Sequence, residues 1–165
     1  MVLDDGNVKE LDAKPPSQDR VPVTEAHRQS IIDPLTAMLT PTAGEGLIPQ
    51  VCQRTLAIFD GYQRYDLKVT FKRMDTLKAA QGYDGPVVVC SATHHPIAGH
   101  RTSDPLVNFL AGREIEATLA PVVGVRVMAP VRLSVASMLA NLEVTASRFE
   151  VGPASASRTA IPDTR

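Results

Sequence analysis

Apolar and polar residues alternate along several parts of this chain, and the alternation predicts a β-rich protein. Between 65 and 71 every second residue is apolar, as a strand with one buried face requires. The dipeptide Asp60-Gly61, typical of tight hairpin turns, separates this run from an earlier apolar one. The pattern therefore predicts an antiparallel hairpin with strands at about 54–59 and 63–74.

Four further strand-like runs extend the predicted sheet. They lie at 87–92, 115–119, 125–135 and 142–146. The first is continuously apolar, which is typical of a central strand buried on both faces. Residues 75–85, between the hairpin and this strand, are expected to form a polar connection with some helical character. Six runs joined mostly by short turns predict an antiparallel meander.

The run at 125–135 is expected to supply the main apolar face of the sheet. Its alternate residues on that face are Val125, Val127, Ala129, Val131, Leu133 and Val135. Pro130 and Arg132 are expected to point the other way. A proline inside a strand indicates a bend or bulge, which suits a strongly curved sheet.

Short helices are expected to cover one face of the sheet. Thr24 and Asp33 are suitable N-caps for helices at about 24–31 and 34–39, with their apolar side on the sheet. A single further helical turn is expected at 105–110. The predicted fold class is mainly β: a curved antiparallel sheet, open or half barrel, with one or two short helices packed on it.

The polar, proline-containing start and the Ser/Ala/Pro-rich end of the chain divide it into three parts. Residues 1–23 are expected to be a linker or flexible segment, 24–151 a single β-rich domain, and 152–165 a disordered tail.

Composition narrows the function class. The 165 residues suit one domain, and the formal net charge of −1 with only 4% aromatic residues argues against a nucleic-acid surface. No run approaches the ~20 apolar residues of a membrane span. No basic region and apolar stretch follow Met1, so no secretory signal is expected in the chain as given.

The two cysteines, Cys52 and Cys90, lie at the outer ends of the predicted hairpin unit. They form either a disulfide or two buried free thiols, and the residues alone leave both alternatives open. A disulfide between them would stabilise the fold by ~4 kcal/mol in the chain-entropy model.

Three histidines, His94, His95 and His100, cluster in the sequence and with Asp104 suggest a zinc or copper site of a hydrolase. Neighbouring strand residues point to opposite faces, however, so His94 and His95 do not readily bind one ion. A solvated strand end is the preferred interpretation, and we expect no metal or other cofactor.

The remaining polar residues favour structure over catalysis. Arg64 with Asp66, and His100 with Arg101, are expected to form a structural polar network at the rim of the sheet. No serine lies in a G-x-S-x-G motif, so we expect no catalytic residues and no enzyme.

Four motifs together resemble a domain-of-unknown-function family of exported proteins of Gram-negative bacteria. They read Asp-Pro-Leu-Thr-Ala-Met at 33–38, Cys-Gln-Arg-Thr-Leu-Ala-Ile-Phe-Asp-Gly at 52–61 continued by Arg-Tyr-Asp-Leu at 64–67, Tyr-Asp-Gly-Pro-Val-Val-Val-Cys at 83–90 and Pro-Ile-Ala-Gly-His-Arg at 96–101. The resemblance covers roughly residues 21–151.

The resemblance implies a periplasmic β-rich protein with a disulfide between Cys52 and Cys90, and it transfers no catalytic residue. Family members carry an export signal and further N-terminal strands, so this chain is expected to be an N-terminally truncated member.

Three functional hypotheses follow. The leading one is a non-enzymatic envelope protein whose concave sheet face binds an apolar ligand, such as a lipid or lipoprotein-like ligand, or a protein partner. A curved sheet wrapped on helices is similar to the lipoprotein-carrier fold, by analogy only. The second is an envelope-integrity interaction module with no ligand. The third is a metal-dependent hydrolase using His94, His95 and His100.

Overall fold

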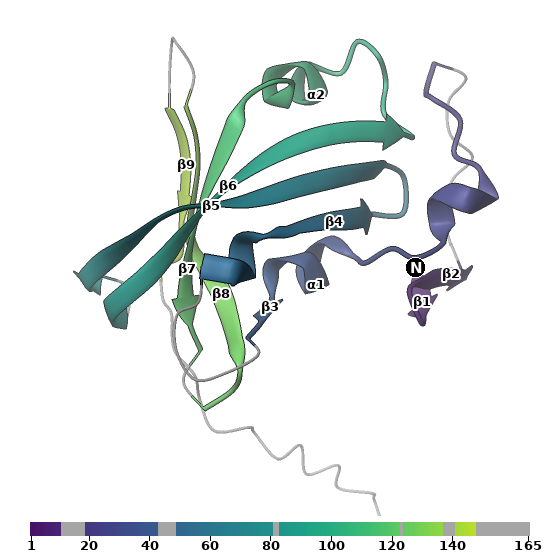
Figure 1. The fold of residues 1–165 in the computed structure, drawn as a ribbon. Helices are drawn as coiled ribbons and strands as arrows, with labels where there is room; N and C mark the ends of the chain where they lie inside the picture. Colours follow the sequence, from purple (N-terminus) through teal and green to yellow (C-terminus); the bar gives the residue numbers. More distant parts are fainter. Residues whose placement is uncertain (11–18, 43–48, 81–82, 123, 137–140, 148–165) are drawn as a thin grey trace, which may run out of the picture.

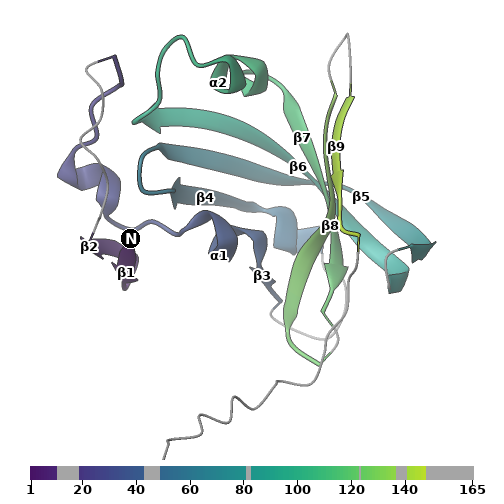
Figure 2. The ribbon, with the colours of Figure 1, turned by 180° about the vertical axis from the view of Figure 1, so that it is seen from behind.

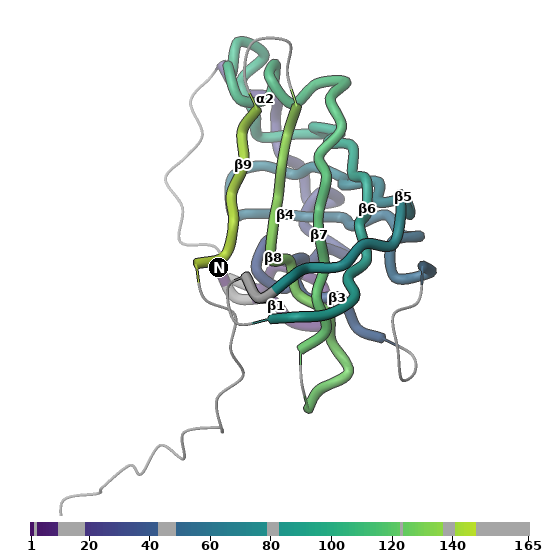
Figure 3. Tube along the Cα trace, turned by 90° about the vertical axis from the view of Figure 1, so that its left-hand side faces the viewer, coloured from purple at the N-terminus to yellow at the C-terminus, as the bar shows by residue number. Residues whose placement is uncertain are grey.

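The structure is a computed structural model that describes residues 1–10, 19–42, 49–80, 83–122, 124–136 and 141–147. Seven strands form one antiparallel sheet in the order β3-β8-β7-β6-β5-β4, with β9 pairing to β8 on the same edge as β3 (Figures 1 and 3). The strands are β3 (Thr40–Pro41), β4 (Arg54–Phe59), β5 (Arg64–Ala80), β6 (Tyr83–Ala98), β7 (Glu114–Pro121), β8 (Val127–Ala136) and β9 (Asn141–Thr145).

The other elements are short. A separate hairpin of β1 (Val2–Asp4) and β2 (Asn7–Glu10) begins the chain. The helical elements are the 3-10 turns η1 (Glu25–Arg28) and η2 (Pro49–Cys52) and the helices α1 (Pro34–Met38) and α2 (Pro105–Leu110). Asp33 and Asp104 cap the two α-helices through their side-chain oxygens, each with a proline at the first helical position.

The sheet curls into a half barrel, and residues 32–41 bridge its two edges (Figures 1 and 2). At one edge, Ile32 pairs with β4: its N–H donates to the Ala57 carbonyl at 2.9 Å, and its carbonyl accepts from Phe59 at 3.0 Å. The chain then forms α1 and joins the other edge, where Thr40 pairs with Met128 of β8. We call residues 32–41 the closing segment.

Bulges account for the strong curvature. The pairing of β7 with β8 shifts register between Thr118 and Leu119, which leaves Val131 as an extra residue in β8. A second shift interrupts the pairing of β5 with β6 at Lys72. An extra residue in one strand bends it and increases its twist, so the sheet curls where these residues lie.

Buried residues lie on both faces of the sheet. One cluster contains Val51, Cys52, Val88, Cys90, Leu119 and Met128 and lies on the concave face. The other contains Val87, Ala120 and Val131. Val87 and Ala120 alternate with members of the first cluster along β6 and β7, so the second cluster lies on the convex face.

Cys52 and Cys90 form a disulfide that joins η2 to β6, as the family resemblance implied. Both residues are completely buried. The bond links positions 38 residues apart, and closing such a loop stabilises the folded state by ~4 kcal/mol in the chain-entropy model. It fixes the chain that follows the closing segment to the concave face.

The predicted fold class is confirmed, but three details of the sequence interpretation were wrong. Residues 75–80 and 83–85 belong to the long strands β5 and β6, not to a helical connection. Within 24–31 only one 3-10 turn forms, and Leu35 of α1 is 76% exposed instead of packing on the sheet. Two expected segments are separate from these errors: the tail at 152–165 lies outside the described residues, and residues 2–10 of the N-terminal segment form the hairpin of β1 and β2.

The expected apolar face of the run at 125–135 was the third error. Pro130, which was expected to point away, lies on the concave side with Leu133, whereas Val131 packs into the convex cluster. The bulge at Val131 reverses the alternation of the strand. Regular alternation therefore predicts the wrong face for residues on one side of the bulge. Val125 lies outside the strand and is 56% exposed.

Gly99, after β6, is packed too closely for any side chain. It has a φ of +79°, and a Cβ at this position would lie 1.8 Å from the Tyr62 carbonyl oxygen. Gly112 has a similar φ of +70° but open space around it. We expect Gly99→Ala to lower the free energy of unfolding by about 3 kcal/mol or more, through clash and strain.

The matched control is Gly112→Ala, for which only the conformational cost of about 1 kcal/mol is expected. Urea denaturation of both variants measures the difference. Equal losses of unfolding free energy in the two variants would contradict the close packing of Gly99 against the hairpin turn.

Candidate functional site

A cavity of about 250 Å³ lies between the concave face of the sheet and the closing segment. All five strands from β4 to β8 contribute to it, together with α1, β3 and η2. The lining residues are Pro34, Ala37, Met38, Thr40, Val51, Arg54, Leu56, Ile58, Tyr65, Leu67, Val69, Cys90, Ala92, Ile115, Ala117, Leu119, Pro130 and Leu133.

Strand register explains why this lining is apolar. Directly opposed residues of an antiparallel pair share one face, and Leu56 opposes Leu67 while Cys90 opposes Ala117. The alternation of 65–71 therefore continues across neighbouring strands. Ala92 and Ala117 have small side chains at the centre of the curled face, which leaves the space unfilled.

Arg54 is the one charged residue in this lining. Its Nη2 donates to Thr40 Oγ1 at 2.5 Å, and its buried Nε has no hydrogen-bond partner among the residues that the structure describes. Burial lowers the pKa of the guanidinium, which still remains protonated because its ordinary pKa is so high. Because β4 and β3 stand at opposite ends of the strand order, this hydrogen bond also spans the open side of the sheet.

The sequence interpretation did not identify Arg54. The available signal was its position two residues before Leu56 and four before Ile58, which places it on the same face of the strand as these apolar residues. A charge among inward-facing positions is the informative exception to the pattern.

The histidines do not form one site. His94 opposes Leu67, so it lies on the concave side, where its ring is 5.0 Å from the Tyr65 ring. His95 follows on the other face and contacts Thr93 through Nε2 at 3.1 Å. Burial, and then the nearby charges of His95 and His100, lower the pKa of His94.

The opposite directions of His94 and His95 agree with the argument made from strand alternation. Within the described ranges, no three His, Cys, Asp or Glu side chains are grouped closely enough to hold a metal ion.

The expected polar network falls into separate contacts. Arg64 pairs with Asp66 at 2.6 Å on the convex side of β5. Arg101 pairs with Asp19 at 2.8 Å, and the His100 carbonyl accepts from the Val21 N–H at 3.0 Å. The second pair of expected residues therefore fixes the segment before η1 to the end of β6.

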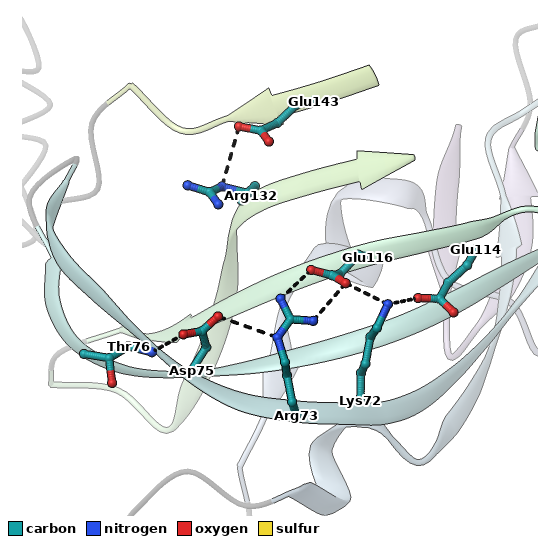
Figure 4. A network of polar contacts seen from close by, with 8 residues as sticks. All are labelled: Lys72, Arg73, Asp75, Thr76, Glu114, Glu116, Arg132 and Glu143. Atoms are coloured by element: carbon teal, nitrogen blue, oxygen red, sulfur yellow. Dashed lines mark hydrogen bonds and ion pairs between the residues drawn. The ribbon is translucent and has the colours of Figure 1, made fainter. Parts of the chain in front are cut away.

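The convex face carries an ion-pair cluster (Figure 4). Glu116 of β7 accepts hydrogen bonds from Arg73 at 2.8 and 2.9 Å and pairs with Lys72 at 2.8 Å, while Lys72 also contacts Glu114. The hydrogen bonds from Arg73, and then from Lys72, lower the pKa of Glu116 to about 2. These four charged side chains pair with one another, whereas the concave face carries the cavity and is therefore the candidate site.

No helix among the described parts of the chain is long and apolar enough to cross a membrane.

The fold and cavity define the class of protein: a half-barrel β protein with an apolar cavity closed by a short helical segment. The chain belongs to the DUF3108 family, described as "Protein of unknown function", whose model matches residues 1–145. Comparison with curated proteins and with solved structures found no match.

Proposed function

We propose that this protein is a non-enzymatic binding protein of the bacterial envelope that holds an apolar ligand in the cavity. The observation that carries the proposal is the cavity itself. Protein interiors are normally close-packed, and an apolar cavity of even ~150 Å³ stays dry and accepts small apolar molecules. A space of about 250 Å³ with an almost wholly apolar lining is suited to such a ligand.

The unfilled space favours a ligand over the alternative of a purely structural module. In a structural module, the chain's own side chains would be expected to fill the concave face. Here Leu35 of α1 is exposed, while the alanines of β6 and β7 leave room beneath the closing segment.

The chemistry of the lining favours binding over catalysis. Its ionisable side chains are Arg54 and Tyr65, and burial, with the charge of Asp60, raises the pKa of Tyr65. An arginine and a tyrosine that both keep their protons are poor general bases at neutral pH. Cys90 is held in the disulfide and is not a nucleophile.

The disulfide supports the envelope part of the proposal. Buried structural disulfides form and persist in oxidising compartments such as the periplasm and are rare in the cytosol. The family resemblance to exported proteins points in the same direction.

Filling the cavity tests the binding function. Ala117 lies at the centre of the lining, and Ala117→Leu adds three carbon atoms to the empty space. We expect the affinity for a hydrophobic fluorescent dye to fall at least about tenfold, because ligand and side chain compete for the same volume. The thermal midpoint is expected to be unchanged or higher, because cavity filling stabilises proteins.

Ala136→Leu is the control, because Ala136 is exposed at the end of β8 and outside the cavity. This variant should bind the dye like the original protein. Saturable binding that survives Ala117→Leu unchanged, or no saturable binding at all, would contradict the proposal.

The thiol state in the native bacterium tests the envelope assignment. After acid quenching, denaturation and alkylation, we expect Cys52 and Cys90 to remain unmodified in intact-mass spectra until a reductant is added. If both cysteines alkylate without reductant, the compartment is reducing and the envelope assignment fails, whereas the binding proposal is unaffected.

A further inference from the structure

Arg54 places a positive charge in a cavity that is otherwise suited to hydrocarbon. Its assigned hydrogen bond goes to a neutral hydroxyl, Thr40 Oγ1. Among the described residues, no carboxylate lies within ion-pair distance of its guanidinium. On other strands Arg73 pairs with Glu116 and Arg64 with Asp66. Arg20 and Arg113, like Arg54, have no described carboxylate partner, but they donate to backbone carbonyls and lie outside the cavity lining.

A partly buried charge with no opposite charge beside it is costly, and an oppositely charged partner offsets that cost when its geometry is good and the remaining donors are hydrogen-bonded. Within the described ranges, nothing accepts a hydrogen bond from the buried Nε of Arg54. A planar guanidinium binds a carboxylate through two parallel hydrogen bonds, which is the strongest arrangement for this side chain. The site is therefore complementary to a ligand that brings a negative charge.

The position of Arg54 sets the orientation of this ligand within the cavity. Arg54 opposes Val69 at one end of the lining, and Ile58 opposes Tyr65 at the other. Four residues of extended strand separate the two ends, which is ~14 Å. The side chains between them on β4 and β5 are Leu56 and Leu67, so the path from Arg54 toward Tyr65 is apolar.

The size of the cavity limits the ligand to one slender chain. Pockets for drug-sized ligands enclose ~300–1,000 Å³, and this one is slightly smaller at about 250 Å³. A lipid with two acyl chains exceeds this space.

We propose that the ligand is a single-chain fatty carboxylate, with its carboxylate on Arg54 and its hydrocarbon chain in the cavity toward Tyr65. This inference rests on the proposed binding function and adds the ligand class, its orientation and the residue that selects it. Thr40 acts as a positioning residue, because its hydroxyl holds the guanidinium over the cavity from the closing segment.

Calorimetric titration with ligands of one chain length tests the head-group preference. Dodecanoate, dodecanol and dodecyl trimethylammonium differ in charge and share their hydrocarbon chain. We expect the protein to bind dodecanoate at least about tenfold more tightly than dodecanol, because a hydrogen bond to a charged group is stronger than one to a neutral group. The ammonium compound is expected to bind weakest.

Arg54→Met keeps much of the side-chain volume and removes the charge. In this variant we expect dodecanoate to lose its advantage over dodecanol, while the affinity for dodecanol stays the same. Arg126→Met is the matched control, because Arg126 is exposed in the turn before β8 and outside the cavity, and it should keep the preference. If Arg54→Met fails to fold, Arg54→Gln replaces it with the same expected loss of preference.

The outcomes separate the two proposals. Binding of dodecanol as tight as that of dodecanoate, or a carboxylate preference that survives both Arg54 substitutions, would overturn the head-group inference and leave the binding function standing. Tighter binding of dodecyl phosphate than of dodecanoate would overturn the assignment of a carboxylate. If none of these ligands binds the original protein, the binding function itself fails.

Discussion

The rest of the structure depends on how the concave face of a strongly curled sheet is covered. A curled antiparallel sheet has an apolar inner face that must be removed from water. Here residues 32–41 cover it by joining both edges: Ile32 extends the β4 edge, and Thr40 pairs with β8. The Cys52–Cys90 disulfide then fixes the following chain to the same face. The closing segment is short, and its one α-helix has five residues, so it covers the face without filling the space beneath it.

This incomplete filling links fold to function. The convex face carries an ion-pair cluster around Glu116, whereas the concave face has small side chains at its centre and an arginine with no described carboxylate partner. Both properties of the concave face are costly in a protein with no ligand, because unfilled volume loses dispersion contacts and an unpaired charge loses solvation. A single amphiphilic molecule compensates for both costs at once, which is why we assign the cavity and Arg54 to the same ligand.

Much of the fold could be predicted from local pattern, and the site could not. Alternation and turn chemistry, which act over a few residues, predict the hairpin at Asp60-Gly61, parts of strands β4 to β7, strand β9 and the cap Asp33. They do not predict that β5 and β6 continue through 75–80 and 83–85. The faces of β8 could not be predicted, because one extra residue at Val131 reverses its alternation. The cavity and the contact of Arg54 with Thr40 depend on the curl of the whole sheet, which brings its edge strands together. Of the site, the sequence pattern indicates only that Arg54 shares one face of its strand with the apolar residues that point inward.

The most direct test of the central claim is to locate a bound chain within the protein. Intermolecular NOEs between protein methyl groups and the chain protons of a bound fatty carboxylate report direct contact with the chain. We expect such NOEs at the methyl groups of Leu67 and Leu133, which line the cavity, and none at Val87 and Val131 on the convex face. NOEs to the convex-face methyl groups instead, or to neither pair at saturating ligand, would contradict the claim that the cavity beneath the closing segment is the binding site.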